Sequence, residues 1–374
     1  MWVSRVEVFD FRSYEEAGLG LEPGATVLLG SNASGKTNLV EAVGFAATLE
    51  SHRIAKDSAL VRWGAERAVI RVSARVRQER DVVVELQIDP SRTCRPRING
   101  AEVPRTRDVL GHVRCVMFTP EDVRLVKGEP ADRRRFIDEV MFQVSPRYAG
   151  VRGDYDKVLK QRSALLRTAP SRSADVMRSM DVWDERLAEL GGDLMWGRLN
   201  AVRRLADPMA VAYALISPTR DDALIEYVPS VPGLVSATSK AESARMLLSA
   251  LRDRRDEEMS RGVTLSGPHR DDLRITLCGN PVRGFASHGE SWSLGIALRL
   301  ASFDVMRSLT GDSPVLVLDD VFAELDADRR ERLVAAVSAA DQILVTAAVA
   351  EDVPKSLART EVYVSKGGVS RLDF

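Results

Sequence analysis

Residues 26–41 read Thr-Val-Leu-Leu-Gly-Ser-Asn-Ala-Ser-Gly-Lys-Thr-Asn-Leu-Val-Glu, and the rest of the chain is interpreted from this stretch. The apolar run 27–29 predicts a buried strand, and the residues from Thr37 to about Leu49 predict a helix. Between them, Gly-x-x-x-x-Gly-Lys-Thr begins at Gly30, and this pattern is a P-loop where it joins a strand to a helix. The stretch therefore predicts nucleotide binding.

The residue types in this loop suit phosphate binding. Gly30 and Gly35 let the backbone curl so that successive N–H groups point at phosphate oxygens. Lys36 is expected to neutralise the β- and γ-phosphates, and the Thr37 hydroxyl to bind Mg²⁺. A glycine-rich turn before an ordinary helix is the alternative, and it does not require every fixed position to be filled. The predicted contacts are Gly30, Ser31, Asn32, Ala33, Ser34, Gly35, Lys36 and Thr37.

A second apolar run, 315–318, ends in Asp319 and Asp320. Paired acids at the carboxyl end of a buried strand occupy the position where a Walker B acid meets the magnesium of a P-loop site. One of the two carboxylates is expected to hold Mg²⁺, and the adjacent one to orient or deprotonate the attacking water. Capping of the next helix is the alternative role for this pair.

The loop 286–290, Ala-Ser-His-Gly-Glu, precedes an amphipathic helix predicted over 291–308. A small, Ser- and Gly-containing helix N-terminus is an anion site for the same physical reason as a P-loop. One nucleotide does not need two such anion sites in a single chain. We therefore expect this loop to bind the nucleotide of a partner molecule.

Length and composition indicate a soluble protein of more than one compact unit. The chain has 374 residues, of which 45% are hydrophobic and 29% charged. No apolar run approaches the roughly 18 residues that span a bilayer. The alternating, charged N-terminus is unlike a secretion signal, and Cys94, Cys115 and Cys278 lack metal-ligand spacing. We expect a cytoplasmic protein, without a membrane partner, whose net charge of −1 requires a local patch for any nucleic-acid contact.

An arginine-rich strand supplies one such patch. Residues 67–77 alternate, which places Arg71, Arg75 and Arg77 on one face of a sheet, and Asn99-Gly100 marks a hairpin nearby. The face is either solvated or a track for DNA phosphates, and the two interpretations are equally good. Two roles are likewise possible for Arg12, which lies just before the P-loop strand. Its side chain either reaches the nucleotide or is exposed at the surface.

The middle of the chain is helical. Apolar residues recur at helical spacing over 131–143, 147–167 and 175–206, with breaks predicted at 168–173 and at Pro208. A charged helix is predicted over 238–258. The sequence therefore predicts an inserted helical arm, which at about a hundred residues is too short for a long coiled coil.

Several motifs together resemble the RecF family of bacterial recombination and repair proteins, relatives of the SMC and ABC-type ATPases. The motifs are the P-loop, Leu-Ser-Gly-Pro-His-Arg-Asp-Asp-Leu at 265–273, the loop 286–290, and Val-Leu-Val-Leu-Asp-Asp-Val-Phe-Ala-Glu-Leu-Asp at 315–326. The resemblance runs over the whole chain. It implies an α/β ATPase head of the ABC/SMC type, made of two sequence-distant lobes, residues 1–120 and 223–374, with the helical arm 121–222 between them.

The resemblance also implies a mechanism, in which Asp319 holds the magnesium ion and Asp320 polarises the attacking water. It implies an ATP-dependent homodimer with two nucleotides at its interface, in which Ser287 and Gly289 reach the γ-phosphate across the dimer and Asp326 lies at the interface. It implies DNA as a partner, double-stranded or at gaps and junctions with single strands. RecO and RecR are further implied partners, and through them RecA is loaded on single strands.

Two departures from the family pattern concern the site. Ala33 stands where glycine is usual, so the loop is strained or reshaped if this position needs a positive φ. His288 stands where glutamine is common. The leading hypothesis is a weak, DNA-stimulated ATPase that acts as a switch. Its rivals are a nucleotide-gated scaffold that does not hydrolyse ATP, an SMC-like structural ATPase, and an enzyme that transfers phosphate to a small substrate.

Overall fold

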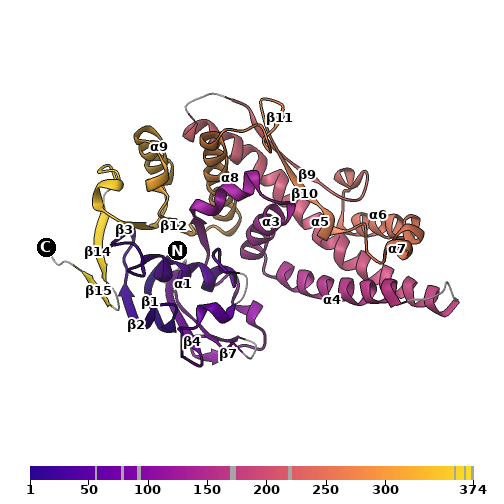
Figure 1. Cartoon of the computed structure of the whole chain (residues 1–374), viewed down its shortest axis with the longest axis horizontal. Helices are drawn as coiled ribbons and strands as arrows, with labels where there is room; N and C mark the ends of the chain where they lie inside the picture. Colours follow the sequence, from indigo (N-terminus) through magenta and orange to yellow (C-terminus); the bar gives the residue numbers. More distant parts are fainter. Residues whose placement is uncertain are drawn as a thin grey trace.

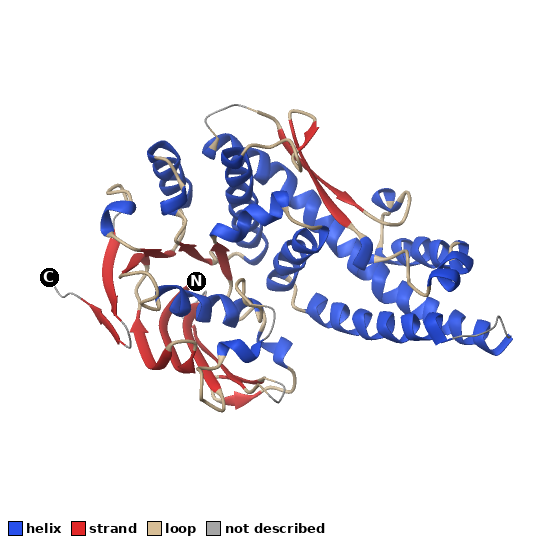
Figure 2. Ribbon diagram, in the orientation of Figure 1, coloured by secondary structure: helices blue, strands red, loops and turns tan. Residues whose placement is uncertain are grey.

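The computed structural model describes residues 1–54, 57–76, 80–90, 94–168, 174–217, 221–357, 359–365 and 368–371. Figures 1 and 2 show an elongated molecule with two large sheets at one end and long helices at the other. No helix of these described ranges is long and apolar enough to cross a membrane. The α/β class predicted from the sequence is confirmed.

A six-stranded sheet carries the P-loop, in the order β15-β14-β3-β13-β12-β8. Its five neighbouring strands β14, β3, β13, β12 and β8 are parallel, and only β15 runs antiparallel to its neighbour. Strands from both ends of the sequence alternate in it, which agrees with a head built from sequence-distant segments. The bounds are β3 Gly24–Leu29, β8 Cys115–Phe118, β12 Val315–Asp319, β13 Gln342–Ala347, β14 Arg359–Ser365 and β15 Gly368–Arg371.

A second, antiparallel sheet has the order β2-β1-β4-β5-β6-β7. The predicted alternation is confirmed, since Ile70, Val72 and Ala74 are buried while Arg71 and Ser73 are partly exposed. Helix α1, Lys36–Thr48, shares one apolar cluster with both large sheets, which explains why it is buried almost all round. The bounds are β1 Trp2–Phe11, β2 Tyr14–Gly20, β4 Ala68–Val76, β5 Arg80–Ile88, β6 Arg95–Ile98 and β7 Ala101–Glu102.

A third, three-stranded sheet, β11-β10-β9, lies beside the long helices. Its strands β9 and β10 pack against α5 and α3, so this segment of the chain belongs to the helical part of the molecule. The bounds are α2 Val123–Lys127, α3 Pro130–Val144, α4 Arg147–Thr168, α5 Ala174–Ile216, β9 Ala223–Val228, α6 Lys240–Asp253, α7 Arg255–Arg261, β10 Asp272–Leu277, β11 Asn280–Pro281, α8 His288–Thr310 and α9 Ala327–Val337.

Two predictions about these elements were wrong, and one strand was missed. Helix α5 continues through Pro208 because its packing against neighbouring elements outweighs the roughly 3 kcal/mol cost of an internal proline. The helix predicted over 238–258 is two helices, interrupted at Arg254. Strand β2 was not predicted at all. The break predicted at 168–173 lies mostly in residues 169–173, outside the described ranges.

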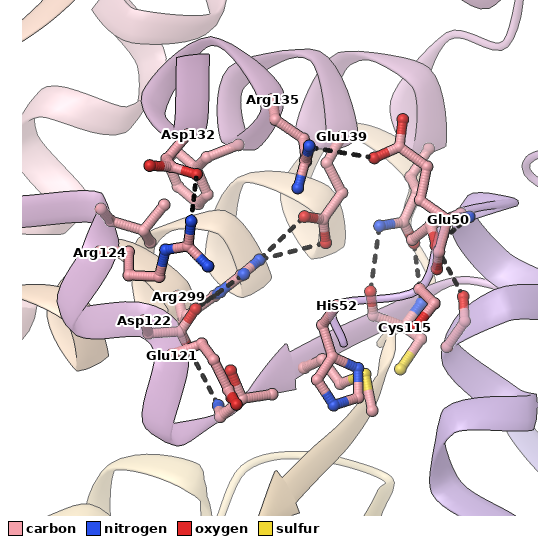
Figure 3. Close-up of a pocket in the computed structure, with 18 of the residues that line it drawn as sticks. Glu50, His52, Cys115, Glu121, Asp122, Arg124, Asp132, Arg135, Glu139 and Arg299 are labelled. Atoms are coloured by element: carbon pink, nitrogen blue, oxygen red, sulfur yellow. Dashed lines mark hydrogen bonds and ion pairs between the residues drawn. The ribbon is translucent and has the colours of Figure 1, made fainter. Parts of the chain in front are cut away.

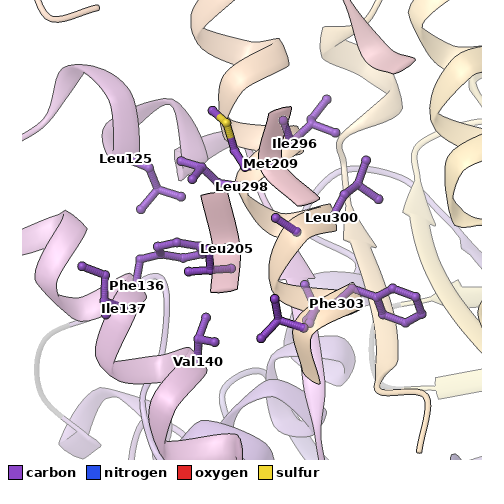
Figure 4. Close-up of a cluster of buried hydrophobic side chains, with 14 of the residues drawn as sticks. Leu125, Phe136, Ile137, Val140, Leu205, Met209, Ile296, Leu298, Leu300 and Phe303 are labelled. Atoms are coloured by element: carbon purple, nitrogen blue, oxygen red, sulfur yellow. The ribbon is translucent and has the colours of Figure 1, made fainter. Parts of the chain in front are cut away.

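The core between the helices joins the two halves of the sequence. Figure 4 shows apolar side chains of α3, α5 and α8 that belong to one buried cluster. All of those labelled are at most 6% exposed, and they are Leu125, Phe136, Ile137, Val140, Leu205, Met209, Ile296, Leu298, Leu300 and Phe303. Burial of apolar surface contributes about 25 cal/mol per Å² to the free energy of folding. The burial of these side chains therefore stabilises α8 in its position.

Candidate functional site

The P-loop has the backbone that its sequence predicts. Gly30 and Gly35 have φ angles of 159° and 111°, and a side chain at either would overlap neighbouring atoms, Val364 O at Gly30 and the Tyr14 ring at Gly35. Ala33 lies in the left-handed region, at φ 64°. The position where the sequence substitutes alanine for glycine therefore does require a positive φ, and the strain is of order 1 kcal/mol.

Lys36 is held inside its own loop. Its side-chain Nζ donates to the carbonyl oxygens of Gly30 at 2.7 Å and of Ser31 at 3.1 Å. These carbonyls keep the ammonium group over the loop, close to the backbone N–H groups at the start of α1. A cation at this place complements the phosphates of a nucleotide.

The P-loop and the paired acids meet. Thr37 Oγ1 donates to Asp319 Oδ1 at 2.9 Å, and Thr346 Oγ1 donates to the same oxygen at 2.6 Å. Two oxygens that occupy adjacent corners of a magnesium octahedron, at bonds of 2.0–2.1 Å, are about 2.9 Å apart. Thr37 and Asp319 therefore fit the predicted Mg²⁺ site.

Asp320 is the second of the paired acids. Its backbone lies in the left-handed region at φ 53°, and its N–H donates to Thr346 Oγ1 at 2.9 Å. Burial and then the neighbouring Asp319 carboxylate raise the pKa of Asp320. A carboxylate with a raised pKa is a stronger base at neutral pH, which suits a group that accepts a proton from water.

Buried polar atoms without a hydrogen-bond partner lie around the loop. Within the described residues, Ser34 Oγ, Tyr14 Oη and both ring nitrogens of His52 are of this kind. Burial raises the pKa of Tyr14 to about 12, so its hydroxyl stays protonated. Because an unsatisfied buried group costs about 1–3 kcal/mol, their clustering here points to a bound polar ligand.

Arg12 is neither a surface residue nor a free cation. Its guanidinium forms two hydrogen bonds with Glu41 of α1, at 2.8 and 2.5 Å, and Nη1 donates to Ala59 O at 3.1 Å. Its side chain is 13% exposed. The pair fastens the turn between β1 and β2 to α1, next to Ser13, whose Oγ accepts a hydrogen bond from Asn38 Nδ2.

The loop 286–290 begins α8 with a capping box. Ser287 Oγ accepts from the Glu290 N–H at 3.2 Å, and the Glu290 carboxylate accepts from the Ser287 N–H at 2.7 Å. A Cβ at Gly289 would lie 2.9 Å from Nη2 of Arg329. Among the residues that the structure describes, no hydrogen bond or ion pair joins Ser287 or Gly289 to the P-loop.

Asp326 caps the next helix, α9. Its carboxylate accepts from the Arg329 N–H at 2.9 Å and pairs with the Arg329 guanidinium at 2.9 Å. Arg329 also lies beside Gly289. Asp326 and the start of α8 are thus linked through one arginine.

The predicted arginine face is electrically balanced. Arg71 is paired with Glu85 at 2.7 Å and Glu7 at 3.4 Å, and Arg75 with Asp81 at 3.1 Å. Arg77 lies outside the described residues. The two described arginines are therefore not an unpaired basic track, because β5 places a carboxylate directly opposite each of them.

The motif at 265–273 joins the long helices. Arg198 of α5 donates to Pro268 O and to both oxygens of Asp138, and Arg133 of α3 forms a bidentate pair with Asp272. His269 is hydrogen-bonded to Tyr155 of α4 at 2.7 Å. The motif thus holds α3, α4 and α5 together.

Sequence reasoning missed three residues of the site: Thr346, His52 and Glu41. Thr346 is the penultimate residue of β13, the neighbour of β12, and it was detectable because adjacent parallel strands end at the same edge of a sheet. His52 and Glu41 carry no motif. The packing of the loop after α1 brings His52 to the site, whereas Glu41 lies on α1 itself.

The chain resembles known proteins over its whole length. The model of the RecF/RecN/SMC N-terminal domain matches residues 2–371. A protein of Streptomyces avermitilis named DNA replication and repair protein RecF is 50% identical, with all of both chains covered. A solved structure of the recombination mediator protein RecF with ATP in the RecFOR pathway is 26% identical, with a TM-score of 0.90 over 100% of this chain and 98% of the other. An SMC head bound to the C-terminal winged-helix domain of ScpA, at 15% identity and a TM-score of 0.57, shares the fold.

Proposed function

Because this chain belongs to the RecF/RecN/SMC N-terminal domain family, we propose that it is an ATP-dependent DNA-binding protein of replication and recombinational repair. The observation that carries the proposal is the hydrogen bond between Thr37 and Asp319, which lies next to Asp320. In the same loop the Ser34 hydroxyl is buried and has no hydrogen-bond partner among the described residues. This arrangement matches the needs of a magnesium-bound nucleoside triphosphate. Its likeness to a RecF structure with ATP supports adenine as the base.

Each residue then has a role in the site. The N–H groups of residues 30–37 and the Lys36 ammonium bind the phosphates. Thr37 and Asp319 hold Mg²⁺, which when bound neutralises charge on the β- and γ-phosphates. Asp320 accepts a proton from water as the water attacks, a role to which its raised pKa contributes. Arg12 positions the turn beside the loop through Glu41.

The loop 286–290, which we call the signature loop, completes the nucleotide site of a second copy of the chain. Ser287 and Gly289 bind the γ-phosphate of the partner, and Asp326 lies at the same interface. The lack of a described contact between these residues and their own P-loop supports this assignment. ATP therefore closes a dimer, and hydrolysis, which is slow and stimulated by DNA, reopens it.

The biological role follows from the family. The dimer closes on DNA at gaps and junctions in the cytoplasm, and it acts with RecO and RecR so that RecA is loaded on single strands. A scaffold that never hydrolyses ATP is the main rival. It differs in one respect: Asp320→Asn would leave its function intact.

Mass measurement in solution tests the proposal. Light scattering with and without ATP and Mg²⁺ is expected to show a doubling of mass for the wild type and for Asp320→Asn. Lys36→Met, which loses the phosphate-binding cation, and Ser287→Arg, which blocks the shared site, are expected to remain monomeric. A wild-type mass that ATP does not change would contradict the shared site.

A further inference from the structure

His52 faces the proposed metal ligand from a side that the P-loop does not occupy. Its Nε2 lies 3.7 Å from Asp319 Oδ2, and its side chain is 14% exposed. In the described part of the chain neither ring nitrogen has a hydrogen-bond partner, although both are buried. An imidazole in such a place requires a polar partner, and the Asp319 carboxylate is the nearest one that the structure records.

The loop that carries His52 is fastened to the P-loop helix. Ser51 Oγ donates to Glu41 Oε1 at 2.5 Å, and the N–H groups of Arg53 and Ile54 donate to Ser51 Oγ at 3.1 and 3.3 Å. Glu41, 1% exposed, lies on α1 and also holds Arg12. The imidazole is therefore positioned by the same helix that presents Lys36 and Thr37.

The two oxygens of Asp319 have different surroundings. Oδ1 accepts the hydroxyls of Thr37 and Thr346, whereas Oδ2 has His52 as its recorded neighbour. The two hydroxyls restrain only the Oδ1 side of the carboxylate. A donor at Oδ2 would fix its plane and keep Oδ1 directed at Thr37.

The His52 side chain borders a pocket whose lining does not include Asp319. Cys115, Met117 and Thr119 also line it, and Figure 3 shows His52 below a set of charged side chains. Those charges are largely satisfied by each other: Arg299 binds Asp122 and Glu139. The pocket thus offers space beside the ring without a competing recorded partner for its nitrogens among the described residues.

We propose that His52 is a positioning residue of the nucleotide site, whose Nε2–H donates to Asp319 Oδ2 and so holds the carboxylate in its metal-binding orientation. This inference rests on the proposed function. Partners of this kind behind a metal ligand typically contribute 10- to 100-fold to metal affinity. The proton stays on the imidazole throughout, and no bond is formed or broken at His52.

The test measures metal-dependent nucleotide binding, not turnover. The affinity for the non-hydrolysable analogue adenylyl imidodiphosphate is determined by calorimetry with and without Mn²⁺, and the ratio of the two affinities is the metal effect. We expect His52→Ala to reduce this ratio about tenfold while the metal-free affinity stays unchanged. His112→Ala, at a half-buried histidine outside the lining of this pocket, is the control and is expected to keep the full ratio.

Two amide variants separate positioning from a packing role. The side-chain NH₂ of glutamine can reach the place of Nε2, whereas that of asparagine corresponds to Nδ1. We expect His52→Gln to keep most of the metal effect and His52→Asn to lose it. A wild-type ratio in His52→Ala, or equal ratios in the two amide variants, would overturn the inference. A wild type whose affinity does not respond to Mn²⁺ would instead overturn the proposed metal site, and this inference with it.

Discussion

Thr37 and Asp319 are 282 positions apart in the chain, yet Thr37 Oγ1 lies 2.9 Å from Asp319 Oδ1. The parallel sheet makes this contact possible, because β3, which leads into the P-loop, and β12, which ends in Asp319, are both neighbours of β13. The hydrogen bond between the two side chains occupies the place where both would face a metal ion. Their energetic effects on nucleotide binding are therefore expected to be coupled.

The first prediction concerns this coupling. Thr37→Ala removes one oxygen ligand and Asp319→Asn replaces the carboxylate by a neutral amide, and each is expected to lower the Mg²⁺-dependent affinity for ATP about tenfold or more. The double variant is expected to bind little worse than either single variant, because groups that share one ion are not independent. Fluorescence titration with a labelled nucleotide measures all four proteins. Additive losses, or equal losses in the absence of Mg²⁺, would show that the residues do not share a metal.

A second prediction concerns the strained alanine of the P-loop. Ala33 has φ 64°, a conformation that costs an L-residue about 1–2 kcal/mol, whereas glycine adopts it freely but loses more entropy on folding. Ala33→Gly is expected to raise the free energy of unfolding by about 0.5–1 kcal/mol. Denaturant unfolding measures this, with Ala335→Gly on the exposed face of α9 as control, which is expected to lose about 1 kcal/mol. A lower free energy of unfolding in both variants would show that the backbone of Ala33 is not strained.

The main features of fold and site were predictable because their signals are local. The strand, loop and helix around Gly30, and the apolar strand before Asp319, each depend on a short pattern. The course of α5 through Pro208 depends on tertiary packing, which no short pattern records. Likewise, Glu85 and Asp81 neutralise the arginine face because β5 pairs with β4 in one register, and that register was not deduced from the sequence.

A third prediction follows from a buried histidine of the helical part. Burial lowers the pKa of His269 to about 4, so the folded protein keeps the ring neutral where the unfolded chain, with a pKa near 6.5, takes up a proton. The free energy of unfolding therefore has its full value above pH 6.5 and decreases as the pH falls toward 4. At pH 5 the loss is of order 2 kcal/mol. Denaturant unfolding at pH 7 and pH 5 measures it.

The matched variant for this histidine is His269→Gln, which keeps hydrogen-bonding groups but does not titrate. It is expected to be less stable than the wild type at pH 7, because the bond to Tyr155 is disturbed, and to lose less stability between pH 7 and pH 5. An unchanged pH dependence in His269→Gln would mean that other groups cause the acid sensitivity.

A fourth prediction concerns an exposed aromatic residue beside the signature loop. Phe285 is 76% exposed and lies two positions before Ser287, on a turn fixed by hydrogen bonds to Val282 O. In the proposed dimer this surface meets the partner, so Phe285→Ser is expected to weaken ATP-dependent association several-fold. The affinity of the monomer for ATP is expected to be unchanged. Val182→Ser removes an apolar side chain of α5 that is 67% exposed, and it is the control. Equal dimer affinities for the two variants would remove Phe285 from the interface.

The last prediction tests the arginine face as a DNA surface, using the carboxylates that neutralise it. If phosphates bind there, Arg75→Ala removes one contact and is expected to reduce the slope of log affinity against log salt by about 1. Asp81→Asn frees Arg75 from its 3.1 Å pair and is expected to strengthen DNA binding. Fluorescence anisotropy with duplex and gapped DNA at several salt concentrations measures both. Opposite changes in the two variants support direct phosphate binding, because only a surface that faces DNA responds to both signs of charge. Unchanged slopes in both would show that this face is solvated and that DNA binds elsewhere.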